Sequence, residues 1–198
     1  NLKNSSRQDA LTPIAKALNC DRLHLIKNAG ETNIDDKFCL NVLSVFDEEN
    51  WMQPSNPDAI NIALYHGSVS GCKTDSGWTM QYGEHDVAIF DKFDYAFLGD
   101  IHKTNQTLDK EKRIRYAGST VQQNHGETND KGFLVWDVDK RDSKFVNVPN
   151  DYGYYTINVV NGHIPSLDDL PKYPRLRVKF EKTSSADIKK LIAVIKQK

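Results

Sequence analysis

Three potential metal ligands stand where two apolar runs of the sequence end. The run 62–65 stops at His66, and the run 95–98 is followed by Asp100 and His102. Short apolar runs indicate buried strands, and ligands of open sheets bind at the carboxyl ends of the strands. Asp100 and His102 are two residues apart, so in an extended segment both side chains point to one side. An imidazole and a carboxylate directed together suit Mn²⁺, Fe²⁺ or Zn²⁺.

The same three residues also have a simpler interpretation. An Asp-x-His pair in a soluble protein is usually a pair of exposed polar residues with no ligand. His66 can join Asp100 and His102 only if the two strands are neighbours in one sheet. The sequence therefore predicts a metal site here and leaves the exposed-polar alternative open.

Hydrophobic periodicity predicts the elements that would position these residues. Residues 9–18 have the spacing of an amphipathic helix, and residues 84–93 predict a second, short helix. Strands are expected at 23–27, 38–46, 60–65, 95–98, 113–117, 132–138, 144–148, 154–160 and 175–180. Residues 184–187 fit a capping box before a final helix. The turn-rich stretch 165–174 and residues 149–151 are the two candidate domain boundaries.

Composition limits the class of protein. The 198 residues are 38% hydrophobic and 27% charged, as expected for a globular protein, and no apolar stretch approaches the length needed to cross a bilayer. There is no signal-peptide pattern, and the three cysteines form no CxxC pair. We therefore expect a cytoplasmic protein with reduced thiols and no membrane contact. The polar opening without an initiator Met is typical of a piece of a longer polypeptide.

Charge is distributed unevenly along a chain whose net charge is only −1. From residue 172 onward there are nine Lys or Arg and two acidic residues. Basic patches favour phosphate backbones, although an ordinary solvated charged surface explains the pattern equally well. The candidate DNA contacts are Lys103, Arg113, Arg115, Arg175, Arg177 and Lys179.

Three motifs carry a resemblance to a known family. They are YHGSVSG at 65–71, FLGDIHK at 97–103 and YAGST at 116–120, followed by the pair Gly126-Glu127. Together they resemble the C-terminal half of a calcineurin-like metallophosphoesterase. Within that superfamily the chain is most similar to SbcD-type nucleases of double-strand break repair, especially phage recombination endonuclease subunits. The resemblance extends over roughly residues 1–148.

The resemblance implies a fold class, a cofactor and a ligand set. The fold would be α/β: a mixed β-sandwich flanked by helices over 1–150, then the beginning of a small α+β capping domain over 151–198. Two divalent ions are implied, Mn²⁺ before Mg²⁺, with His66 and His102 as ligands. Asp100 stands where the family has the first histidine of Gly-His-x-His, and the added negative charge favours harder ions. In members of the family, the other ligands, including the metal-bridging carboxylate, come earlier in the sequence than the segment that resembles Asn1–Ala10.

The function implied is phosphodiester hydrolysis by an exo- and endonuclease in recombination and repair. DNA, a second copy of the protein and an SMC-like coiled-coil ATPase are the expected partners. Since the upstream ligands are missing from these 198 residues, we expect this chain to be inactive and to bind Mn²⁺ weakly. Two alternatives remain open: a phosphoesterase acting on proteins or small phosphates, and a non-catalytic DNA-binding or assembly module.

Overall fold

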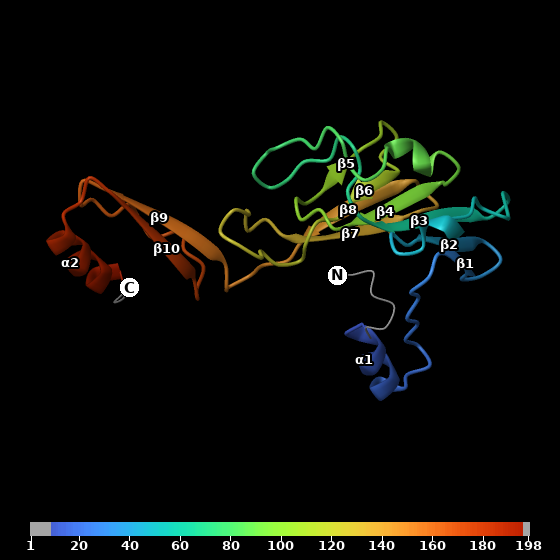
Figure 1. Cartoon of the computed structure of the whole chain (residues 1–198), viewed down its shortest axis with the longest axis horizontal. Helices are drawn as coiled ribbons and strands as arrows, with labels where there is room; N and C mark the ends of the chain where they lie inside the picture. Colours follow the sequence, from blue (N-terminus) through green and yellow to red (C-terminus); the bar gives the residue numbers. More distant parts are fainter. Residues whose placement is uncertain (1–8, 196–198) are drawn as a thin grey trace. The chain divides into compact units, whose positions relative to one another are not determined.

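Parallel strands form the centre of the largest sheet. The computed structural model describes residues 9–195 (Figure 1). Strands β2 (Phe38–Leu43), β3 (Ile60–His66) and β4 (Tyr95–Gly99) are parallel neighbours, and β1 (Gly30–Asn33) pairs antiparallel with β2. β3 and β4 are apolar almost throughout because both of their faces are covered.

The remaining elements are short. They are the helices α1 (Leu11–Leu18) and α2 (Ser185–Ile195), the 3-10 helices η1 (Glu48–Asn50) and η2 (Val87–Phe90), and the strands β5 (Gln106–Thr107), β6 (Ile114–Tyr116), β7 (Gly132–Asp137), β8 (Asp142–Asn147), β9 (Tyr154–Val160) and β10 (Arg175–Glu181). The six-stranded sheet has the order β1-β2-β3-β4-β6-β5. Neither α-helix of the described residues is long and apolar enough to span a membrane.

The chain divides into two compact units. The first comprises the described part of Asn1–Gly71 together with Gln81–Asp100 and Thr107–Arg115. The second comprises Cys72–Met80, Ile101–Gln106 and the described part of Tyr116–Lys198. The expected division into 1–150 and 151–198 follows the family resemblance and stays a prediction.

Within the second unit, β9 and β10 form a parallel two-stranded ribbon with α2 beside it (Figure 1). Ile157 and Val159 of β9 are fully buried and pack with Ile195 of α2. Before α2, the backbone N–H of Asp187 donates to Ser184 Oγ at 3.2 Å, which is one of the two hydrogen bonds of the expected capping box, and the Ser184 hydroxyl donates to Asp187 Oδ2 at 2.6 Å. The other strand pair of this unit, β7 and β8, is an antiparallel hairpin.

The expected α/β sandwich flanked by helices is wrong. The described chain is mainly β-structure with two short α-helices, and α1 has no buried residue. The crossovers into β3 and β4 contain only the 3-10 helices η1 and η2. The physical reason is composition: residues 47–58 and 67–83 are rich in Pro, Gly, Asn, Asp and Ser, which favour turns over helices.

Individual strands and helices match the sequence pattern unevenly. β9 has the predicted bounds, and β3, β4, β7 and β10 differ from prediction by one residue. The strand expected at 23–27 is wrong, because Leu23, Leu25 and Ile26 are exposed in irregular backbone. The helix expected at 84–93 is the single turn η2, capped by Asp86, whose side chain accepts from the Ala88 N–H. The family match at the opening of the chain lies, for residues 1–8, outside the described residues.

Candidate functional site

His66 and Asp100 lie together at the carboxyl edge of the parallel sheet. His66 ends β3 and is in register with Gly99, the last residue of β4, so Asp100 follows directly beside it. His66 Nε2 is 3.8 Å from Asp100 Oδ1, and the two side chains are 78% and 49% exposed. Two atoms that each bond a metal at about 2.1 Å lie roughly 3 to 4 Å apart. This pair therefore fits two ligands of one divalent ion.

The backbone next to Asp100 has two features that allow His66 and Asp100 to lie this close together. A Cβ atom on Gly99 would lie 2.6 Å from His66 Nδ1, so only glycine leaves room for the imidazole in its present position. Asp100 has φ +86°, a left-handed conformation that non-glycine residues seldom adopt. Backbone strain of this kind collects at functional sites, where the surrounding structure maintains it.

Glu84 holds the turn that follows His66. Its carboxylate accepts from the Ser68 N–H at 3.0 Å, and its own N–H donates to Ser68 Oγ at 3.0 Å. The Tyr65 hydroxyl donates to the same carboxylate at 3.4 Å. Burial, followed by the negative charge of Glu84, raises the pKa of Tyr65, so this phenol stays protonated as a donor. A Cβ on Gly67 would lie 2.6 Å from Glu84 Oε2, so a larger residue there would displace this carboxylate.

His102 lies in the second unit, where Glu127 holds its ring. His102 Nδ1 is 2.9 Å from Glu127 Oε1, and the Glu127 side chain is only 6% exposed. The same carboxylate accepts from the Gln123 N–H at 3.0 Å and from Asn124 Nδ2 at 2.8 Å. Since Nδ1 is occupied, Nε2 is the ring nitrogen of His102 left for another ligand.

A fully buried lysine, Lys131, joins His102 and Glu127 to Asp75 in one cluster. Lys131 Nζ is 2.8 Å from Asp75 Oδ2 and 3.2 Å from Glu127 Oε2, and it donates to the His102 carbonyl at 3.0 Å. Burial alone would raise the pKa of Glu127, but the hydrogen bonds from His102, Gln123 and Lys131 outweigh it and lower the pKa. Glu127 is thus an ionised carboxylate in a buried position.

The structure joins only part of the predicted ligand set. His66 and Asp100 form a pair, and His102 pairs with Glu127. Among residues 9–195, no group of three His, Cys, Asp or Glu side chains is arranged to hold a metal ion. The described donors therefore fit an ion only in part, as two ligands at one position and one oriented imidazole at another.

The six candidate DNA contacts differ in accessibility. Arg113 donates to the Phe93 carbonyl at 3.0 Å and pairs with Asp109, and Arg115 is 7% exposed. Lys103 is half-buried. By contrast, every basic side chain predicted on β10 is exposed: Arg175, Arg177 and Lys179. They alternate with half-buried apolar residues, as the sequence pattern predicts.

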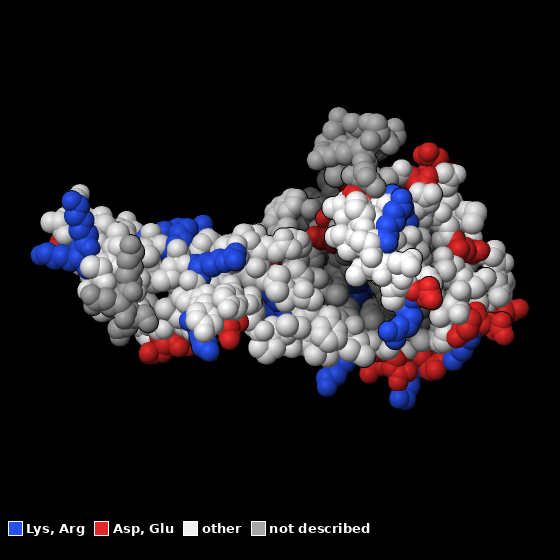
Figure 2. Space-filling view, turned by 90° about the horizontal axis from the view of Figure 1, so that it is seen from below, with Lys and Arg blue, Asp and Glu red and all other residues white. Residues whose placement is uncertain are grey.

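Partners on β9 hold the basic side chains of β10. Arg175 Nη1 donates to the Tyr154 hydroxyl at 2.7 Å, and its guanidinium lies 5.1 Å from the centre of the Tyr154 ring. Arg177 Nη2 donates to Thr156 Oγ1 at 3.1 Å. In Figure 2, Lys and Arg are spread over the part that contains β9, β10 and α2. A row of fixed cations on a ribbon can contact successive phosphates.

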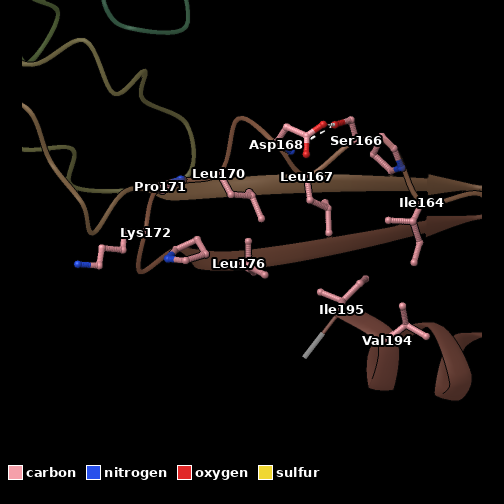
Figure 3. Close-up of a pocket in the computed structure, with 12 residues that line it drawn as sticks. Ile164, Ser166, Leu167, Asp168, Leu170, Pro171, Lys172, Leu176, Val194 and Ile195 are labelled. Carbon is pink, nitrogen blue, oxygen red and sulfur yellow. Dashed lines mark hydrogen bonds between the residues drawn. The ribbon is translucent and has the colours of Figure 1, made fainter. Parts of the chain in front are cut away.

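A cavity of about 610 Å³ with a mixed apolar and polar lining lies in the second unit beside α2 (Figure 3). Leu167, Leu170, Leu176 and Ile195 are among the side chains that line it. None of the predicted ligands or DNA contacts lines this cavity. The cavity therefore shares no lining residue with the predicted metal ligands or with the basic side chains of β10.

The sequence did not single out Lys131 or Asp75 as site residues. Glu127 was named only as part of the Gly126-Glu127 pair, without a role of its own. A lysine in a strand-entry segment is expected to be exposed, since buried lysines are rare unless paired. The partner Asp75 lies 56 residues away in sequence from Lys131. No local pattern links two such residues, so only the folded chain shows the ion pair.

No protein-family model matches the chain. Among curated proteins, one described as uncharacterized protein R555 of Acanthamoeba polyphaga mimivirus is 33% identical over 204 residues. The alignment covers 97% of this chain and 15% of that protein. The chain therefore spans about one seventh of the length of this relative, and nearly all of it is similar to a segment of the viral protein.

Proposed function

We propose that this chain is part of a metal-dependent phosphodiesterase, an SbcD-type DNA nuclease of the calcineurin-like metallophosphoesterase superfamily. The observation that carries the proposal is the pairing of His66 and Asp100 at the ends of two parallel strands, 3.8 Å apart. The left-handed backbone at Asp100 and the tight approach of Gly99 to the imidazole support it, because they maintain a costly local geometry.

The proposed site residues bind and orient rather than transfer protons. His66 and Asp100 would be ligands of one divalent ion, and His102, whose ring Glu127 holds at Nδ1, would bind a divalent ion through Nε2. Mn²⁺ or Mg²⁺ bound in such a site supplies Lewis-acid stabilisation of a phosphodiester and a nucleophile at neutral pH. In the whole protein, further ligands would come from outside this chain.

Duplex DNA is the proposed substrate. The exposed face of β10 presents Arg175, Arg177 and Lys179 on alternate positions, with hydrogen bonds that fix two of the three guanidinium or ammonium groups. Such a row would contact the phosphate backbone without reading sequence. The proposal includes assembly with a second copy and with an SMC-like coiled-coil ATPase.

The proposal places the protein in the cytoplasm. Cys20, Cys39 and Cys72 lie within the described residues and none is disulfide-bonded. Reduced thiols fit a cytoplasmic compartment.

A non-catalytic DNA-binding module is the second candidate function. It is favoured by one specific contrast: the basic face of β10 is exposed as a continuous row, whereas the described residues offer no three-ligand metal group. In that case the strained turn at Asp100 would be a remnant without a chemical role.

Cleavage assays on the longest natural polypeptide that contains this sequence decide between the two. We expect Mn²⁺-dependent cleavage of linear duplex DNA that is lost in Asp100→Ala, with duplex binding retained. Cleavage of a small phosphodiester but not of DNA would instead support the small-phosphate alternative. DNA binding without cleavage in the wild type would support the non-catalytic module. The isolated 198-residue chain is expected to show no cleavage.

A further inference from the structure

His102 is held at two points by residues that belong to one buried cluster. Its ring meets Glu127 through Nδ1 at 2.9 Å. Its carbonyl accepts from Lys131 Nζ at 3.0 Å and from the Ser119 N–H at 3.3 Å. A histidine whose ring and backbone are both fixed has little freedom to rotate, so the direction of Nε2 is determined by the cluster.

The hydrogen bonds around Glu127 determine which nitrogen of His102 carries hydrogen. The Glu127 carboxylate takes hydrogen bonds from the Gln123 N–H, from Asn124 Nδ2 and from Lys131. An ionised carboxylate can only accept. Contact at Nδ1 therefore requires a hydrogen on Nδ1, and a neutral imidazole then has its lone pair on Nε2.

Lys131 and Asp75 hold Glu127 in that role. The ammonium of Lys131 is fully buried and contacts both carboxylates, with Asp75 at 2.8 Å and Glu127 at 3.2 Å. It therefore fixes the second oxygen of Glu127 while the first faces the imidazole. A buried charge of this kind persists because each ion is paired.

We propose that Glu127 is a positioning residue that locks His102 in the Nδ1–H tautomer, so that Nε2 is presented as an electron-pair donor to a divalent cation. That a divalent cation accepts this electron pair rests on the proposed function, whereas the tautomer follows from the hydrogen bonds of the cluster alone. Carboxylates that accept from a ligand histidine in this way orient the ring and raise its basicity.

The tautomer can be observed directly in the 198-residue chain without metal. Long-range ¹H–¹⁵N correlation spectra at pH 8, with His102 assigned by loss of its signals in His102→Gln, distinguish a protonated Nδ1 from a protonated Nε2. We expect Nδ1–H in the wild type and a shift toward Nε2–H in Glu127→Ala. The matched control Glu181→Ala changes an exposed glutamate of β10 and should leave His102 unchanged. Nε2–H in the wild type would overturn the proposal even if the alanine variant fails to fold.

Metal titration then separates this inference from the proposed function. In Glu127→Gln, which keeps the size of the side chain, we expect Mn²⁺ affinity of the longest natural polypeptide to fall about 10- to 100-fold. If the wild-type tautomer is Nδ1–H and Mn²⁺ affinity is unchanged, Glu127 still positions His102, and the assignment of His102 as a ligand is refuted. If the tautomer does not depend on Glu127, the positioning role itself is refuted.

Discussion

Gln122 and Tyr154 are joined by a pair of hydrogen bonds between side chain and backbone. The Tyr154 N–H donates to Gln122 Oε1 at 2.6 Å, and Gln122 Nε2 donates to the Tyr154 carbonyl at 3.0 Å. Gln122 Nε2 also donates to the Glu127 carbonyl at 2.6 Å. One buried amide thus ties the segment that holds His102 to the first residue of β9, the strand that supports the basic face.

Removing this amide should destabilise the second unit. Gln122→Ala leaves the partly buried N–H and carbonyl of Tyr154 without their side-chain partner, and we expect a loss of about 1 to 3 kcal/mol in the free energy of unfolding. Urea denaturation followed by tryptophan fluorescence measures it. Gln123→Ala is the matched control, because Gln123 is exposed and only its backbone N–H is used. Equal losses in both variants would contradict the role given to Gln122.

Lys131 should be the most costly charged residue to replace in the second unit. Lys131→Met leaves Asp75 and Glu127 buried without their counter-ion, a change that costs about 3 to 5 kcal/mol. The double variant Lys131→Met/Asp75→Asn removes one of the orphaned carboxylates, so we expect it to be more stable than Lys131→Met alone. Additive losses in this double-mutant cycle, measured by urea denaturation, would show that the two residues do not interact.

Acid should weaken the cluster through Glu127. Its pKa in the folded chain is lowered from the ordinary value of 4.5. Its contribution to stability is therefore fully present above that value and is lost as the pH falls through the lower, folded-state pKa. Comparing the free energies of unfolding of wild type and Glu127→Gln between pH 7 and pH 3 tests this. The difference between them should shrink toward acid pH, and a constant difference would contradict the linkage.

Gly99 should be required only because of His66. In Gly99→Ala the new Cβ would lie 2.6 Å from His66 Nδ1. We therefore expect overpacking to lower the free energy of unfolding by about 1 to 3 kcal/mol. In a His66→Ala background the imidazole is absent, and the same substitution should be nearly neutral. A loss of equal size in both backgrounds would place the strain in the backbone instead of the ring contact.

The basic face of β10 should bind DNA through phosphates. Replacing Arg175, Arg177 and Lys179 with Gln should weaken binding to all duplex sequences alike and reduce the slope of log K against log salt by about 2.7, near 0.9 per lost contact. The control triple Lys16→Gln/Lys92→Gln/Lys110→Gln removes the same charge from exposed positions of the first unit. An equal effect of the control would indicate attraction by overall charge rather than a binding face.

Strand positions could be predicted from sequence where apolar residues follow a clear period. β9 and β10 alternate, and most of β3 and β4 consists of consecutive apolar residues, so these strands can be recognised without tertiary information. The same reasoning failed at 23–27, because three apolar residues in a short run do not ensure burial. It also failed for the flanking helices, since motifs at strand ends say nothing about the long loops between them.

The candidate site was only partly accessible to sequence reasoning. The neighbouring ends of β3 and β4 follow from two apolar runs that stop at polar residues, and the pairing of His66 with Asp100 follows from that. The contact between Lys131 and Asp75 joins residues far apart in the chain. Neither residue type nor spacing marks such a pair, because the ion pair exists only once both segments are packed.

Binding of Mn²⁺ to the 198-residue chain tests the central claim most directly. Electron paramagnetic resonance of free Mn²⁺ measures occupancy in the wild type, His66→Ala, Asp100→Ala and the control His163→Ala, which changes an exposed histidine of the second unit. We predict weak, saturable binding in the wild type and the control that is lost when either member of the 3.8 Å pair is removed. Binding that is unchanged in both His66→Ala and Asp100→Ala would contradict a metal site at the ends of β3 and β4.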